Sequence, residues 1–218
     1  MPETAFEVVY DGPALDDGRI PVRDLAPALL ALGDLFAEAR KVAYPDMPHV
    51  SLEIQATREG SFGVDLILQA ADGIWEQVVT TSGSDEVSAL VNLKELIIGG
   101  GFVGYFGYRK RIKGRRVTKQ EPADGGQTKV TADDGASITV RHEIIVLDEN
   151  SRVRRSARSV VQPLSASGVE RLDFKDEAEV TESLDQDDVP SFALPSAEPD
   201  ESEEPEEQVF EDVLLIDL

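Results

Sequence analysis

An apolar run rich in glycine, residues 97–108, leads directly into a basic cluster at 109–116. Five of the nine residues from 99 to 107 are glycine, and glycine weakens a helix or a strand unless close packing compensates for it. The run is therefore expected to lie tightly against something. The candidates are another subunit, a membrane interface and a nucleic acid.

This run is too short to cross a membrane, because its uncharged part, 96–108, has 13 residues and a transmembrane helix needs about 20. In a helix, Gly100 and Gly104 would share one face, which favours close packing on another helix or another copy of the chain. We therefore predict a non-catalytic interaction protein that forms a homo-oligomer or docks a protein partner through 96–108. The predicted interaction residues are Gly100, Gly104, Phe102, Tyr105, Phe106 and Tyr108.

Two alternatives stay open for the same segment. Aromatic rings beside a basic cluster are typical of an interfacial anchor on an anionic membrane, here spanning 102–116. The same cations could meet nucleic-acid phosphates while the rings stack on bases, with the acidic tail competing for the patch. Nucleic acid is the less favoured partner, because one short basic cluster is most often a solvated helix end. The predicted basic patch consists of Arg109, Lys110, Arg111, Lys113, Arg115 and Arg116.

The formal charge of −22 is concentrated near the C-terminus, where residues 176–218 hold 17 Asp and Glu and no Lys or Arg. Such a segment buries too little apolar surface to offset its ordering entropy, so we predict a disordered acidic tail over 176–218. Residues 209–218 are apolar again, which predicts either a docking motif or the first strand of a further domain. The motif residues are Phe210, Val213, Leu214, Leu215 and Ile216.

Hydropathy patterns predict an α+β fold, with an antiparallel sheet packed with helices and a small second α/β element. Residues 6–10 and 50–57 form strands in this interpretation, and 62–68 follows 50–57 after a polar turn, as in an antiparallel hairpin. A helix capped by Asp24 and running to about residue 44 has apolar residues at three- and four-residue spacing. Further helices are expected at 72–78, 85–96 and 150–161, and further strands at 128–131, 137–140 and 169–174.

Composition along the chain suggests four parts. Residues 121–126 combine Pro, Asp and Gly, which is typical of a linker. The predicted parts are an N-terminal α+β domain (1–118), a linker (119–127), a small α/β element (128–175) and the acidic tail (176–218).

Catalytic signatures do not emerge from the sequence. The only histidines, His49 and His142, form no HxxxH or HExxH pair, and the chain has no cysteine. The glycines at 99–101 lack the Gly-Lys-Ser/Thr ending of a phosphate-binding loop. We therefore expect no enzyme, metal or cofactor. The N-terminus has no basic, apolar signal, so the expected localisation is cytoplasmic, or membrane-peripheral under the anchor alternative.

Several segments together resemble one group of bacterial proteins. They are 6–10 (Phe-Glu-Val-Val-Tyr), the helix entry 20–26, 59–62 (Glu-Gly-Ser-Phe), the glycine-aromatic-basic stretch, and 153–155 leading to 161–164. Over roughly residues 5–175 the chain is similar to uncharacterised bacterial proteins of prophage and mobile-element settings. The resemblance implies a cytoplasmic α+β protein with no catalytic residues to carry over. It also implies a longer chain, which favours the further-domain interpretation of the terminal motif.

Overall fold

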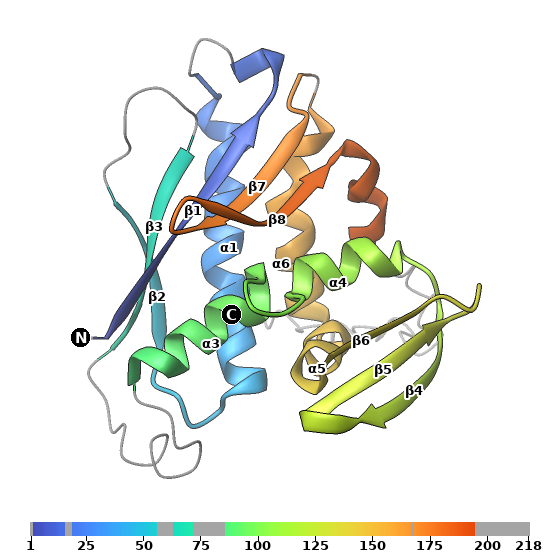
Figure 1. Cartoon of the computed structure of the whole chain (residues 1–218). Coiled ribbons are helices and arrows are strands. Elements are labelled where there is room, and N and C mark those ends of the chain that lie inside the picture. Colours follow the sequence, from blue (N-terminus) through green and yellow to red (C-terminus); the bar gives the residue numbers. More distant parts are fainter. Residues whose placement is uncertain (1, 16–18, 56–62, 72–85, 167, 195–218) are drawn as a thin grey trace, which may run out of the picture.

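The computed structural model describes residues 2–15, 19–55, 63–71, 86–166 and 168–194 (Figure 1). These residues form two antiparallel sheets packed with helices, which confirms the predicted α+β class. The predicted helix 72–78 lies outside the described residues. So does the tail from 195 onward, with its terminal docking motif.

A five-stranded antiparallel sheet is the main layer, in the order β2-β3-β1-β7-β8. The first strand along the chain lies at its centre, with Val8 opposite Val64 of β3 on one side and Phe174 of β7 on the other. The sheet therefore joins segments from both ends of the described chain. Its strands are β1 (Glu3–Asp11), β2 (Val50–Ile54), β3 (Gly63–Ala70), β7 (Arg171–Asp176) and β8 (Glu179–Asp185).

One face of this sheet is apolar because side chains alternate along each strand. Phe6, Val8 and Tyr10 of β1 are buried on the side covered by α1 (Val22–Ala43) and α6 (Ser151–Val161), which lie behind the sheet in Figure 1. The rings of Phe6 and Phe36 are 5.5 Å apart, and the Tyr10 hydroxyl donates a 2.9 Å hydrogen bond to the carbonyl oxygen of Val160. These contacts fix both helices on the sheet.

A smaller three-stranded sheet, in the order β4-β5-β6, lies beside the main layer with the remaining helices (Figure 1). Its strands are β4 (Val117–Ala123), β5 (Gln127–Ala132) and β6 (Ser137–Arg141). The helices are α3 (Glu86–Ile98), α4 (Tyr105–Ile112) and α5 (His142–Glu149). Short 3-10 turns are η1 (Pro13–Leu15), η2 (Asp124–Gly126), η3 (Gln162–Ser165) and η4 (Gln186–Phe192).

The long first helix begins earlier than its sequence suggested. Pro21 takes the N-cap position and makes no side-chain capping bond, so Asp24 is a residue of the first turn rather than the cap. An acidic side chain there still meets the positive end of the helix dipole. Pro27 is then the sixth residue of the helix, past the first turn, so its missing N–H leaves the carbonyl oxygen of Arg23 without its helical donor.

The expected linker, 119–127, is a paired strand and a tight turn. β4 pairs with β5 along its length, and Pro122 is tolerated because β4 is an edge strand, where a missing N–H removes no sheet bond on its open side. The glycines that suggested a linker, Gly125 and Gly126, have φ of 71° and 73° in the hairpin turn. A turn and a linker carry the same composition.

The expected disordered tail also begins too early. Residues 179–192 form β8 and η4, and the buried side chains of Leu184 and Phe192 hold them on the core. The other β8 side chains are polar or exposed, so its composition resembles that of the tail. Because β1 pairs with β7, the predicted boundaries at 118 and 175 do not separate two sheets.

Candidate functional site

The glycine-rich run is a tight loop between two helices rather than one helix. The loop 99–104 connects α3 to α4, and Gly99 and Gly100 have φ of 82° and 146°, which glycine alone adopts readily. A Cβ atom on Gly104 would overlap the backbone nitrogen of Gly99 and lie 2.8 Å from its Cα. Gly100 and Gly104 therefore share no helix face, and the close packing that glycine permits is of the loop on itself.

The aromatic residues of the predicted interaction segment are core residues, with one exception. Tyr105, Phe106 and Tyr108 are 0%, 0% and 1% exposed, because α4 packs among α3, α5, η4 and β8. The ring of Phe106 lies 4.6 Å from that of Phe174. Burial raises the pKa of the Tyr105 hydroxyl well above its ordinary value. These three rings therefore offer no surface to a partner or a membrane, whereas Phe102 in the loop is 51% exposed.

Two residues of the predicted basic patch are structural. Arg109 is buried, and its Nη1 donates to Asp148 Oδ1 at 3.0 Å while its Nη2 donates to the carbonyl oxygen of Ser191. Lys110 donates to the carbonyl oxygen of Ser183 at 2.6 Å and pairs with Asp188 at 3.2 Å. These cations hold α5, β8 and η4 on α4, so they are not part of an open patch.

Of the other four residues of the predicted patch, one forms an ion pair and three are exposed. Arg115 pairs with Asp134 of the small sheet at 3.1 Å. Arg111, Lys113 and Arg116 are exposed, and only Arg111 lies beside the glycine loop.

A polar hollow of about 430 Å³ lies under the glycine loop, and we call it the loop hollow. It gathers residues from the loop, α4, β5, β6 and β8, which are far apart in the sequence. Thr181 helps to position β8 there, since its hydroxyl donates a 3.0 Å hydrogen bond to the carbonyl oxygen of Ile98 at the end of α3. Its lining residues are Gly100, Gly101, Phe102, Val103, Arg111, Gln127, Thr139, Val140, Arg141, Thr181 and Glu182.

One wall of the loop hollow is a cation stacked on an aromatic ring. The guanidinium carbon of Arg141 is 5.5 Å from the centroid of the Phe102 ring, within the range of a cation–π contact. Arg141 Nη2 also donates to the carbonyl oxygen of Asn92 at 3.3 Å, whereas its buried Nε has no hydrogen-bond partner in the described part of the chain. The contact holds the exposed Phe102 ring over the end of β6.

Another part of the lining carries a carboxyl group beside a second guanidinium. A Cβ atom on Gly107 would overlap Glu182 Oε2 and lie 3.0 Å from Arg111 Nη1, so this glycine makes room for both side chains. Burial raises the pKa of Glu182, and the positive charges of Arg111 and Lys110 oppose that rise. With two guanidinium groups and one carboxyl group, the loop hollow favours an anionic group such as a carboxylate.

Sequence reasoning found Gly100, Phe102 and Arg111 but missed the other charged residues of the loop hollow. Arg141 lies at the end of a predicted strand, and Glu182 lies in the segment that resembled a disordered tail. No local signal links them to the glycine loop, because the sheets bring them together.

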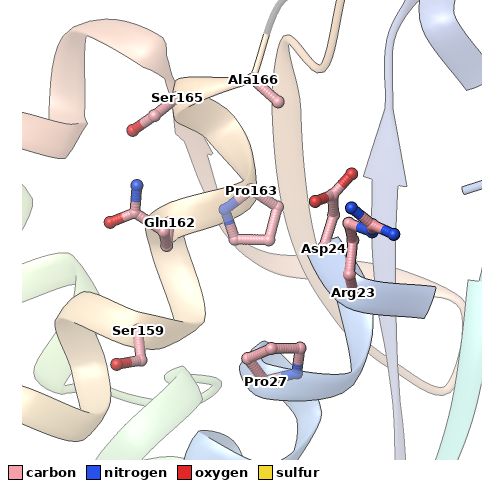
Figure 2. A pocket seen from close by; sticks show the side chains of 8 residues that line it. All are labelled: Arg23, Asp24, Pro27, Ser159, Gln162, Pro163, Ser165 and Ala166. Atoms are coloured by element: carbon pink, nitrogen blue, oxygen red, sulfur yellow. The ribbon is translucent and has the colours of Figure 1, made fainter. Parts of the chain in front are cut away.

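A second hollow of about 340 Å³ lies between the first turns of α1 and the end of α6. Figure 2 shows the rings of Pro27 and Pro163 facing each other, whereas the hydroxyl of Ser159 and the amide of Gln162 point away from α1. Arg23 and Asp24 also line it, so it holds one cation and one carboxylate from the same turn of α1. A third hollow, about 570 Å³, lies over Lys94, whose ammonium group is already paired with Asp176 at 2.6 Å.

Within the described ranges, no group of three or more His, Asp or Glu side chains could hold a metal ion. His49 is exposed, and His142 shares a 3.2 Å hydrogen bond with the Thr128 hydroxyl. The described helices also include none that is long and apolar enough to span a membrane.

No protein-family model, curated protein or solved structure matches this chain.

Proposed function

We propose that this chain is a non-catalytic interaction protein that docks a protein partner, or a second copy of itself, at the loop hollow. The partner contributes a carboxylate to the hollow and an apolar side chain to the exposed Phe102 ring. As the sequence predicted, the docking element is part of the glycine-rich run. The contact, however, is made by the loop 99–104 and not by the rings of α4, which are buried. We further propose that it acts in the cytoplasm, as its cysteine-free sequence suits, in the prophage or mobile-element setting that the resemblance implies.

One observation carries the proposal. Phe102 is half exposed beside two guanidinium groups, Arg111 and Arg141, in a chain whose formal charge is −22. Aromatic residues and arginine are enriched at the centres of protein interfaces and dominate their binding energy. Arginine also binds a carboxylate through two parallel hydrogen bonds, which gives orientation as well as affinity.

The membrane and nucleic-acid alternatives have less support. Both used Tyr105, Phe106 and Tyr108 as surface rings, and all three are buried. Of the exposed cations near them, Arg111 shares the loop hollow with Phe102, the one exposed ring of residues 102–116. That leaves a single aromatic residue where an interfacial anchor or a base-stacking surface uses several.

The test is selection of peptides from a random phage-displayed library on the full-length protein. We expect enrichment of peptides in which Asp or Glu lies next to an apolar residue. Replacing Phe102→Ser and Arg111→Ala together should weaken the selected peptides at least about tenfold, since the loss of about 1.4 kcal/mol gives that factor. Lys119→Ala, a surface change on β4, is the matched control and should leave binding unchanged.

Light scattering after size exclusion tests the second-copy form of the proposal. An oligomer that the Phe102→Ser/Arg111→Ala variant dissociates supports docking at the loop hollow. The proposal is wrong if the selected peptides bind the variant as well as they bind the unchanged protein, and the mass of the protein is the same in both.

A further inference from the structure

Helix α6 presents a strongly basic face that the proposed docking site does not use. Its buried side, formed by residues such as Val153, Ala157 and Val160, packs on α1, and the carbonyl oxygen of Val160 accepts from the Tyr10 hydroxyl of β1. Its other sides carry arginine at four of eleven positions and no acidic residue. We call these residues the arginine face: Arg152, Arg154, Arg155 and Arg158.

Part of the arginine face has its charge unmatched. Arg152 approaches Glu38 of α1 at 3.6 Å, and Arg154 Nη1 donates to the carbonyl oxygen of Asp148 at 2.8 Å. Arg155 and Arg158 are exposed, and none of the described carboxylates lies within salt-bridge distance of either. Two adjacent unpaired guanidinium groups on one helix repel each other, so an anionic neighbour would stabilise them.

The described chain ends close to this face. η4 packs against α6, and Arg109 bonds both the carbonyl oxygen of Ala193 at 3.5 Å and Asp148 at 3.0 Å. The carbonyl oxygen of Asp148 in turn accepts from Arg154. Two residues, Arg109 and Asp148, therefore connect Ala193 to Arg154 of the arginine face.

The residues that follow are the chemical complement of this face. The segment 195–218, which we call the acidic segment, holds ten Asp and Glu and no Lys or Arg, and six of its carboxylates fall between 200 and 207. We propose that the arginine face of α6 is the intramolecular docking surface of the acidic segment. The contact neutralises Arg155 and Arg158 and keeps other polyanions away from α6.

Distance and tethering both favour this occupant over a free polyanion. Asp200, the first of the clustered carboxylates, is six residues beyond Leu194, which allows a reach of about 20 Å. Arg109 and Asp148 link Ala193 to Arg154, and from Arg154 to Arg158 α6 rises only about 6 Å further. A short tether gives an effective concentration of about a millimolar, without any encounter step. A free polyanion would also have to approach a chain with a formal charge of −22.

A spin label on the acidic segment tests the proposal in the full-length protein. The chain has no cysteine, so Ser202→Cys provides one unique labelling site. Paramagnetic relaxation should reduce the amide NMR signals of 152–158 more than those of the small sheet. The loss should disappear when salt rises from about 0.1 M to about 1 M, because the screening length then falls from about 10 Å to about 3 Å.

Charge reversal separates this contact from general attraction. Arg155→Glu with Arg158→Glu should restore the 152–158 signals, whereas the control, Lys119→Glu with Lys129→Glu, makes the same charge change on the small sheet and should not. Unchanged signals elsewhere report that each variant is folded. Equal broadening over the whole surface, or broadening of 152–158 that survives the α6 reversal, overturns the proposal. So does broadening of unlabelled ¹⁵N protein by a labelled second copy, which would make the contact intermolecular.

Discussion

Gly104 is the residue on which the glycine loop depends most directly, and replacing it by alanine tests why. Its φ of −79° and ψ of 178° are accessible to any residue, so backbone conformation does not require glycine there. The lack of space requires glycine, because a Cβ atom would overlap the backbone nitrogen of Gly99 and lie 2.8 Å from the carbonyl oxygen of Ile97. The Gly99 nitrogen is held in place because it donates to the carbonyl oxygen of Glu95, and Ile97 is itself a residue of the last turn of α3.

The cost follows from that overlap. Overpacking typically destabilises by about 1–3 kcal/mol, and contact with backbone rather than a flexible side chain places Gly104→Ala near about 3 kcal/mol. In a chain of this size each kcal/mol shifts Tm by about 2–4 °C, so we expect a drop of about 6–12 °C. Thermal unfolding followed by circular dichroism measures it.

Gly101→Ala is the matched control. Gly101 lies in the same loop, and its nearest contact would be the flexible end of Glu95 at 3.9 Å. This change should leave Tm the same or slightly higher, since alanine restricts the unfolded chain more than glycine does. If Gly104→Ala lowers Tm no more than Gly101→Ala does, the close approach at Gly99 is not what holds the loop.

Two further predictions concern the cations of α4 and the carboxyl group of the loop hollow. Arg109→Met leaves Asp148 without its cation and the Ser191 carbonyl without its donor, so urea unfolding should show a loss of about 3–5 kcal/mol. Lys110→Met removes a cation that is more exposed than Arg109, 35% against 11%, and its partner Asp188 still accepts from the Asp185 amide, so this change should cost about half as much or less. Equal losses would contradict the structural role of Arg109. The second prediction concerns Glu182, whose pKa burial raises above its ordinary value of 4.5. The folded state therefore binds the Glu182 proton more tightly than the unfolded state does. As pH rises through the folded pKa, Glu182 ionises and the free energy of unfolding falls. Glu182→Gln should therefore be more stable than the unchanged protein near neutral pH. It should lose that advantage as pH falls to about 4.5 and below, because the unfolded state is then also protonated. An advantage of equal size at both pH values would refute the argument.

Local patterns were sufficient for the N-terminal half of the fold. The alternation of 50–57 and 62–68 predicted a hairpin, and β2 and β3 pair as antiparallel neighbours with Leu52 opposite Leu68. The apolar spacing on α1 predicted its buried face, where Leu32 and Phe36 lie in the core. These signals are local because each element buries one regular face.

Other elements gave no such signal. β8 is an edge strand that buries Leu184 but leaves Val180 exposed, so its alternation is weak and its acidic composition matched the tail. The rings at 105, 106 and 108 suggested a surface because a basic cluster follows them. Phe106 packs on the rings of Phe174 and Phe192, which lie more than sixty residues further along the chain, and no local pattern reports that packing.

The central place of β1 has a consequence for synthesis on the ribosome. Asp11 of β1 pairs with Arg171 of β7, 160 positions later. At about 5–20 residues per second, the strand waits roughly 10–30 s for this neighbour to be made. During that time the nascent chain holds an unpaired strand edge next to Phe6 and Tyr10. Chaperones that shield such edges should therefore matter more for the yield of this protein than its final stability suggests.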